Sequence, residues 1–97
     1  MNARVTTLQL QSGKIEEAVS LFNGSIVPAL KQQAGFQSAW LLTEPQQSKV
    51  ISITMWATEA DRLASEANGF LRTQLGKLGQ IVASAPVAES YRVSAQA

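Results

Sequence analysis

Hydrophobic residues along the 97-residue chain change their spacing at several points, and each change predicts the boundary of a secondary-structure element. Residues 3–10 are rich in β-branched side chains and precede Ser12-Gly13, a pattern that predicts a strand. From Lys14 the apolar positions recur every three or four residues, which places them on one face of a helix. The positions on this face are Ile15, Ala18, Val19, Phe22, Ile26 and Leu30.

Gly24 and Pro28 lie inside this helical pattern. Proline lacks the amide hydrogen that would bond to the carbonyl of residue 24, so we expect a kink between the two positions. The helix is expected to stop near Gln33. Gly35 follows and can adopt the left-handed conformation that commonly ends a helix.

The second half of the chain contains three further strand patterns and one interrupted helix. The polar segment 44–48 predicts a turn that joins two of the strands into a hairpin. Thr58 is a good helix N-cap, and Gly69 is expected to interrupt the helix that follows it. The predicted ranges are strands 36–43 and 49–56, helix segments 59–68 and 70–78, and a last strand 87–93.

The resulting order is β-α-β-β-α-β, which predicts one ferredoxin-like α+β domain over residues 1–97. Its four-stranded antiparallel sheet would carry both helices on one face. We expect the other face to present apolar or small neutral residues, namely Val50, Ser52, Thr54, Tyr91 and Val93. A second copy packed on this open sheet face would make a homodimer, a dimeric α+β barrel.

Composition strengthens the expectation of a partner chain and removes several kinds of chemistry. Hydrophobic residues make up 45% of the chain and charged residues only 15%, so a small domain has more apolar surface than its own core can cover. Histidine and cysteine are both absent. Their absence excludes disulfides, zinc sites of Cys or His, haem ligated by His, and Ser–His or Cys–His dyads.

The charges give no indication of a nucleic acid or membrane partner. Eight basic and seven acidic residues are spread along the chain without a basic stripe. No apolar run approaches the roughly 20 residues of a membrane span. The N-terminal segment 1–5 has no apolar stretch of the secretory type. We therefore expect a cytoplasmic protein.

Two stretches carry a resemblance to a known family. Residues 25–36, SIVPALKQQAGF, are similar to the end of a first helix followed by the Gly-Phe that opens a second strand. Residues 51–60, ISITMWATEA, are similar to a third strand ending in tryptophan and followed by a capped helix. In these stretches the chain resembles the antibiotic biosynthesis monooxygenase-like domain family, whose members are dimeric α+β barrels. The resemblance extends over nearly the whole chain.

The resemblance implies a choice between two kinds of chemistry. Cofactor-independent oxygenases of this family act on polycyclic phenols and anthrones, and the deprotonated substrate itself delivers an electron to oxygen, so no cofactor is expected. Haem-degrading relatives use a tryptophan, an asparagine and an iron-ligating histidine, which fall on Trp56, Thr6 and a position near Gln74. Only the tryptophan is present, which argues against haem degradation.

Three residues are the candidate substrate-orienting groups. Trp56 ends a strand beside a helix cap, Tyr91 carries a phenolic donor, and Gln74 occupies the position of the missing histidine. They would orient the oxygens of a small aromatic or polyketide-like substrate, while the general base stays unidentified.

The alternative is a non-catalytic homodimeric module that binds a hydrophobic ligand or only supports association. Cavity shape separates these functions, because an open cavity with convergent donors favours an enzyme. A cleft filled by aromatic side chains favours the inert module. The side chains that would fill it are Phe22, Trp40, Trp56 and Phe70.

Overall fold

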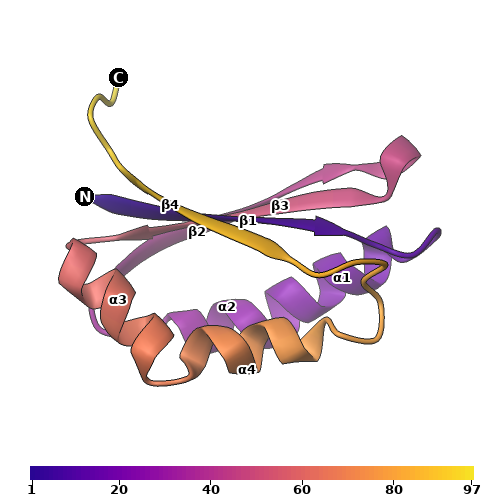
Figure 1. Cartoon of the computed structure of the whole chain (residues 1–97), viewed down its shortest axis with the longest axis horizontal. Helices are drawn as coiled ribbons and strands as arrows, with labels where there is room; N and C mark the ends of the chain where they lie inside the picture. Colours follow the sequence, from indigo (N-terminus) through magenta and orange to yellow (C-terminus); the bar gives the residue numbers. More distant parts are fainter.

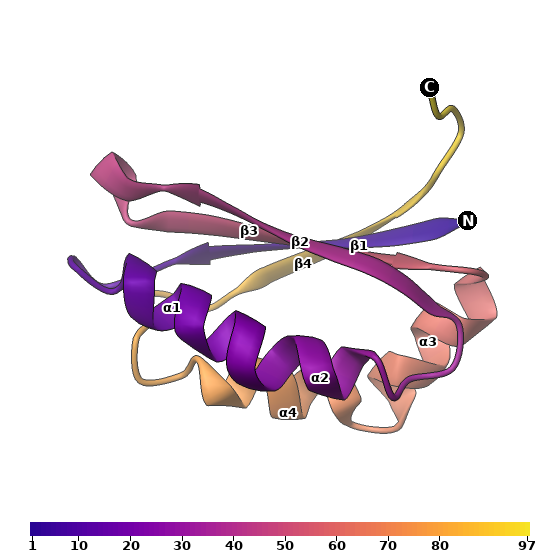
Figure 2. The ribbon, with the colours of Figure 1, turned by 180° about the vertical axis from the view of Figure 1, so that it is seen from behind.

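The computed structural model describes all residues from 1 to 97 and has one layer of helices on one antiparallel sheet (Figures 1 and 2). The strands lie in the order β2-β3-β1-β4, and both views show the helices on the same side. The ferredoxin-like fold is therefore confirmed. The elements are β1 (Asn2–Gln9), α1 (Ile15–Leu21), η1 (Phe22–Ile26), α2 (Val27–Leu30), β2 (Phe36–Glu44), η2 (Pro45–Gln47), β3 (Lys49–Trp56), α3 (Glu59–Ala67), α4 (Phe70–Lys77) and β4 (Val87–Arg92).

The first helix is continuous but irregular where the sequence predicts a kink. A π-helical turn, η1, separates α1 from α2, and Pro28 lies in the first turn of α2. A π turn pairs residues five apart, so it accommodates a proline that cannot make the usual bond to the residue four positions earlier. Helix α2 ends at Leu30, three residues before the predicted end, and a turn leads to β2.

Glycines and a threonine set the remaining boundaries as predicted. Gly35 has a φ of 78°, and a Cβ built on it would collide with the side chain of Asp61. Gly69 has a φ of 85° and separates α3 from α4. The Thr58 hydroxyl accepts a hydrogen bond from the Asp61 amide (3.0 Å) and so caps α3.

The faces of β3 are the reverse of the prediction. Val50 and Thr54 are buried, and with Ser52 they face the helices instead of the open side of the sheet. Side chains alternate along a strand, so they share a face with Trp56, which is 0% exposed. Burial of this large indole therefore determines the orientation of the whole strand. The open face of β3 carries Ile51, Ile53 and Met55.

A β-bulge separates two sets of side chains in β2. The pairing register shifts between Phe36 and Ser38. Phe36 accordingly packs edge-on against Trp56, with ring centroids 5.8 Å apart, on the helix-covered side. Trp40 and Leu42 pair with Ile53 and Ile51 on the open side. Strict alternation along strand 36–43 predicts that Phe36 shares a face with Trp40, and this is wrong because the bulge reverses the alternation.

The hydrophobic core lies between the sheet and the helices, and the opposite sheet face is left uncovered. On that face β4 places Val87, Glu89 and Tyr91 opposite residues 7, 5 and 3 of β1. No helix is both long and apolar enough to cross a bilayer. The buried core residues are Leu8, Leu10, Ala18, Phe22, Ile26, Leu30, Val50, Trp56, Leu78 and Ile81.

Candidate functional site

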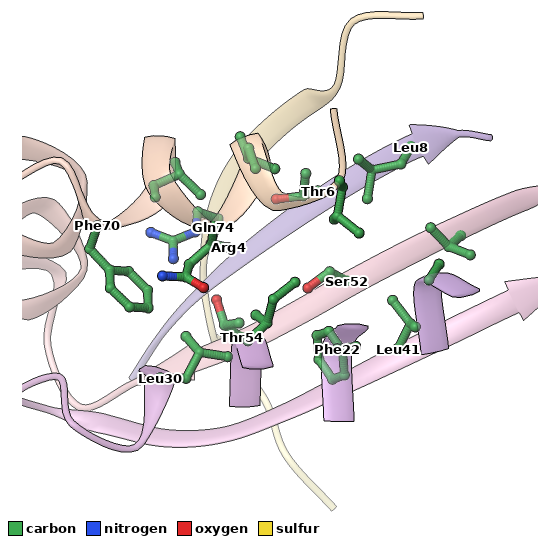
Figure 3. Close-up of a pocket in the computed structure, with 16 residues that line it drawn as sticks. Arg4, Thr6, Leu8, Phe22, Leu30, Leu41, Ser52, Thr54, Phe70 and Gln74 are labelled. Atoms are coloured by element: carbon green, nitrogen blue, oxygen red, sulfur yellow. The ribbon is translucent and has the colours of Figure 1, made fainter. Parts of the chain in front are cut away.

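A cavity lies between the helix-covered face of the sheet and helices α1, η1, α2 and α4 (Figure 3). Eleven of its sixteen lining residues are hydrophobic, so its walls favour an apolar ligand. The space between the walls is about 550 Å³ with the solvent-filled mouth included. The centre of a water molecule can occupy only about 40 Å³ of this space, so the cavity is narrow.

The polar residues of the cavity come from the sheet and from one helix. Arg4 and Thr6 of β1 are paired across the sheet with Thr54 and Ser52 of β3, which makes a polar strip on the cavity floor. Gln74 of α4 lies opposite this strip. Figure 3 shows the Arg4 guanidinium and the Gln74 carboxamide directed into the same part of the cavity.

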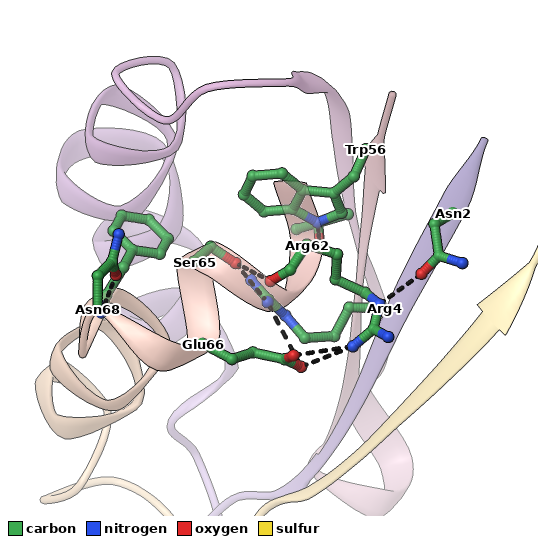
Figure 4. Close-up of polar contacts among 9 residues, drawn as sticks. Asn2, Arg4, Trp56, Arg62, Ser65, Glu66 and Asn68 are labelled. Carbon is green, nitrogen blue, oxygen red and sulfur yellow. Dashed lines mark hydrogen bonds and ion pairs between the residues drawn. The ribbon is translucent and has the colours of Figure 1, made fainter. Parts of the chain in front are cut away.

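Arg4 is a buried cation with few protein acceptors. Its side chain is 3% exposed, and its Nη1 donates to Ser65 Oγ (2.9 Å), which is its only side-chain hydrogen bond. The guanidinium carbon lies 5.2 Å from the centre of the Trp56 ring, a cation–π distance (Figure 4). Nε and Nη2 have no protein acceptor and remain available as donors.

The charges around Arg4 do not balance. Glu66 lies 3.8 Å from Arg4 but makes its short contacts to Arg62, whose Nη1 donates to both carboxylate oxygens (2.8 and 3.0 Å; Figure 4). Arg62 Nε also donates to Asn2 Oδ1. Burial lowers the pKa of Arg4, the charge of Glu66 raises it, and that of Arg62 lowers it. The cluster therefore holds two cations and one anion, which favours binding of a further anion.

Gln74 is the one predicted site residue that lines the cavity. It is 7% exposed, and its Oε1 is buried without a hydrogen-bond donor. The neighbouring side chains of the cavity are mostly apolar, and none of them donates to this oxygen.

Trp56 lies on the helix-covered face of the sheet but does not line the cavity. Its Nε1 donates to Thr54 Oγ1 (3.0 Å), so the indole donor is already occupied. Thr54 does line the cavity. Trp56 is thus connected to the cavity through Thr54 and through its contact with Arg4.

Tyr91 lies on the open face of the sheet, opposite Ala3 of β1, and is not brought together with Gln74 or Trp56. Its hydroxyl donates to Glu89 Oε2 (3.0 Å). This hydrogen bond, together with the negative charge of Glu89, raises the pKa of Tyr91.

We expect a spectrophotometric titration of Tyr91, the only tyrosine, to give a pKa above its ordinary value of about 10. The folded chain favours the neutral phenol, so this stabilisation is present below about pH 10 and is lost as the pH rises through the raised pKa. The substitution Glu89→Ala should return the pKa toward the ordinary value. An unchanged midpoint in Glu89→Ala would contradict the contact.

The aromatic residues expected to fill a cleft are divided between two places. Phe22 and Phe70 line the cavity, whereas Trp40 is 51% exposed on the open sheet face. The cavity is thus narrow, but the two tryptophans do not close it.

No cluster of three or more Asp or Glu side chains is arranged to hold a metal ion.

Arg4 was not among the residues that sequence reasoning selected for the site. A signal was nevertheless present. Arg4 is an even number of positions from Leu8 and Leu10, so it lies on the same face of the strand as these two apolar residues. A charged side chain on the buried face of a strand is unusual and indicates a functional or paired group.

Solved structures with the same fold include two oxygenases. No protein-family model matches the sequence, and no curated protein matches it in sequence. SnoaB, a cofactor-independent oxygenase from Streptomyces nogalater, aligns with a TM-score of 0.79 and 14% identity over 98% of this chain and 94% of that one. The ActVA-Orf6 monooxygenase of Streptomyces coelicolor, solved with nanaomycin D, aligns with a TM-score of 0.77 and 19% identity over 99% and 89%.

A third structure has no assigned activity. The NE2512 protein of unknown function from Nitrosomonas europaea aligns with a TM-score of 0.75 and 21% identity over 99% of this chain and 91% of that one. Likeness at these identities establishes the fold. The resemblance to antibiotic biosynthesis monooxygenases that the sequence indicates is confirmed at this level.

Proposed function

We propose that this protein is a cofactor-independent monooxygenase acting on a small aromatic or polyketide-like compound bound in the cavity. The observation that carries the proposal is Arg4, a buried cation with unused donors at one end of an apolar cavity. Such a group binds the oxygen of a phenolate or enolate, the form of the substrate that reacts with oxygen. The oxygenases among the structural neighbours support the same reaction class.

The proposed reaction balances without an added reductant. Loss of a proton from an acidic ring CH₂ gives an enolate, which transfers one electron to O₂, and the two radicals combine to a hydroperoxide. Elimination of water then leaves a carbonyl, so one oxygen atom of O₂ enters the product and the other leaves as water with both hydrogens. The charge-assisted hydrogen bond from Arg4 stabilises the enolate oxygen throughout.

The predicted site residues have different parts in this proposal. Gln74 contacts the substrate directly. Trp56 acts indirectly, because it orients Thr54 and packs on Arg4. Tyr91 is separated from the cavity by the sheet and belongs to the open face.

Oxygen consumption with anthrone tests the proposal. We expect the protein to consume one O₂ for each anthrone converted to anthraquinone, faster than the protein-free solution. Trp56→Phe keeps an aromatic ring but removes the donor to Thr54, and should lower kcat/KM by up to about tenfold, the effect of one hydrogen bond. Unchanged turnover in Trp56→Phe would remove Trp56 from the site, and absence of uptake across anthrones and hydroxynaphthalenes would contradict the activity.

A ligand-binding module without chemistry is the second candidate. The observation in its favour is that Arg4 is the only titratable residue lining the cavity, so the chain supplies no general base there. Tight binding of an aromatic anion with no oxygen uptake would favour this function.

We further propose that two copies pack through their open sheet faces to form a homodimer. Four of the six strongly exposed large hydrophobic residues lie on this face, namely Trp40, Leu42, Val87 and Tyr91. Ile51 and Ile53 lie between them and extend the apolar surface across the sheet. A second copy presents the same apolar surface and would cover much of it.

Trp40→Lys should convert the dimer to a monomer. A lysine in the middle of β2 places a charge against the partner's apolar surface, and loss of a tryptophan buried in an interface weakens association by roughly 100-fold. Sedimentation analysis at micromolar concentration measures the change. Leu63→Lys is the matched control, because Leu63 is exposed to a similar degree on helix α3. A wild-type mass equal to one chain would contradict the dimer.

A further inference from the structure

Gln74 is the cavity residue whose polar group the fold leaves unsatisfied. Its side chain is more than nine-tenths buried, and its Oε1 has no donor. Buried polar atoms are almost always paired, because an unpaired acceptor destabilises the folded state. Packing alone therefore does not account for a glutamine, since a methionine or leucine would occupy the same place without an unpaired acceptor.

The surroundings of Gln74 determine which group of a ligand can donate a hydrogen bond to its Oε1. Arg4, directed into the same part of the cavity, has only donors, so it attracts an anionic oxygen of the ligand (Figure 3). That oxygen is itself an acceptor and cannot bond to Gln74 Oε1. A hydrogen-bond donor carried elsewhere on the ligand would pair with Oε1 while Arg4 binds the anionic oxygen.

We propose that Gln74 determines specificity by selecting a hydroxylated aromatic anion, whose anionic oxygen binds Arg4 and whose separate hydroxyl donates to Gln74 Oε1. This inference rests on the proposed function in taking the cavity as the substrate site. A site that holds a buried acceptor for a ligand hydroxyl discriminates against the analogue without it, because the acceptor then stays unpaired.

Benzoate and the ortho, meta and para hydroxybenzoates are suitable probes. All four carry one negative charge at neutral pH, and the three isomers place the hydroxyl at different distances from the carboxylate. Calorimetric titration should show at least one isomer binding about three- to tenfold more tightly than benzoate, the contribution of one hydrogen bond. In Gln74→Met this preference should disappear while benzoate affinity is retained.

Two further variants make the result specific. Gln74→Leu removes the acceptor with a different side chain, and should lose the same preference. Gln32→Met makes the same substitution as Gln74→Met at an exposed position outside the cavity and should keep the preference. Thermal unfolding of each variant verifies that it is folded.

Three results would overturn the assignment of Gln74. These are equal affinity of wild type for all four anions, no binding of any of them, and a hydroxyl preference that persists in both Gln74 variants. Oxygen consumption is measured separately. Uptake with anthrone in a protein that has no hydroxyl preference would overturn this inference alone, and a hydroxyl preference without uptake would overturn only the monooxygenase activity.

Discussion

Replacement of Arg4 by methionine is expected to reverse the direction in which the cavity shifts the pKa of a bound phenol. 4-Nitrophenol reports this directly, because its neutral and ionised forms absorb at different wavelengths. In wild type the Arg4 cation should lower the pKa of the bound phenol by about one unit, which corresponds to about 1.4 kcal/mol. In Arg4→Met the apolar walls remain and the cation is lost, so the pKa of bound phenol should rise above its value in water.

The same substitution should weaken binding of the phenolate by about 10- to 100-fold, the effect of a hydrogen bond to a charged group. The fold should survive, because Glu66 keeps its ion pair with Arg62 and a buried cation is replaced by an apolar side chain. Arg72→Met changes the net charge equally at an exposed position of α4 outside the cavity and should behave as wild type. Equal pKa values in Arg4→Met and Arg72→Met would contradict the proposed anion site.

Trp56→Ala should have the largest effect on stability. The side chain is 0% exposed, packs edge-on with Phe36, and supports the Arg4 guanidinium. Its removal leaves a cavity in the core and should lower the free energy of unfolding by about 3–5 kcal/mol. This is a large part of the total of about 5–15 kcal/mol that a domain possesses.

Urea unfolding at one fixed protein concentration measures this loss, since association with a second copy would otherwise shift the transition. Trp56→Phe is the matched control. It keeps a packed aromatic ring and should cost clearly less than Trp56→Ala, because it leaves a smaller cavity. A free energy of unfolding for Trp56→Ala within 1 kcal/mol of wild type, on the order of an ordinary surface substitution, would show that the indole is not a packing centre.

The order of elements could be predicted from the sequence because local signals mark each boundary. The Thr58 cap and the break at Gly69 depend on neighbouring residues, and the positive φ of Gly35 is indicated by the glycine itself. The orientation of β3 could not be predicted in the same way. Both of its faces are uncharged, and the choice between them depends on contacts of Trp56 with Phe36 and Arg4, which are distant in sequence.

The candidate site could be predicted only in part for the same reason. Gln74 was indicated by resemblance and does line the cavity. Arg4 looked like one of eight scattered basic residues, because its burial depends on a hydrogen bond to Ser65, which lies 61 positions away. A single sequence shows that an arginine stands in this strand. It does not show that a residue of a distant helix forms a hydrogen bond with it.

The break at Gly69 separates two parts of the second helical segment that contact different groups. Helix α3, before the break, carries Ser65 and Glu66, which hold the charged cluster, and α4, after it, carries Gln74 and much of one cavity wall. The regular helical hydrogen bonding of α3 ends before Gly69, and helix α4 begins after it. Substitutions in α4 can therefore reshape the cavity wall while α3 continues to hold the Arg4 side chain of β1 in place.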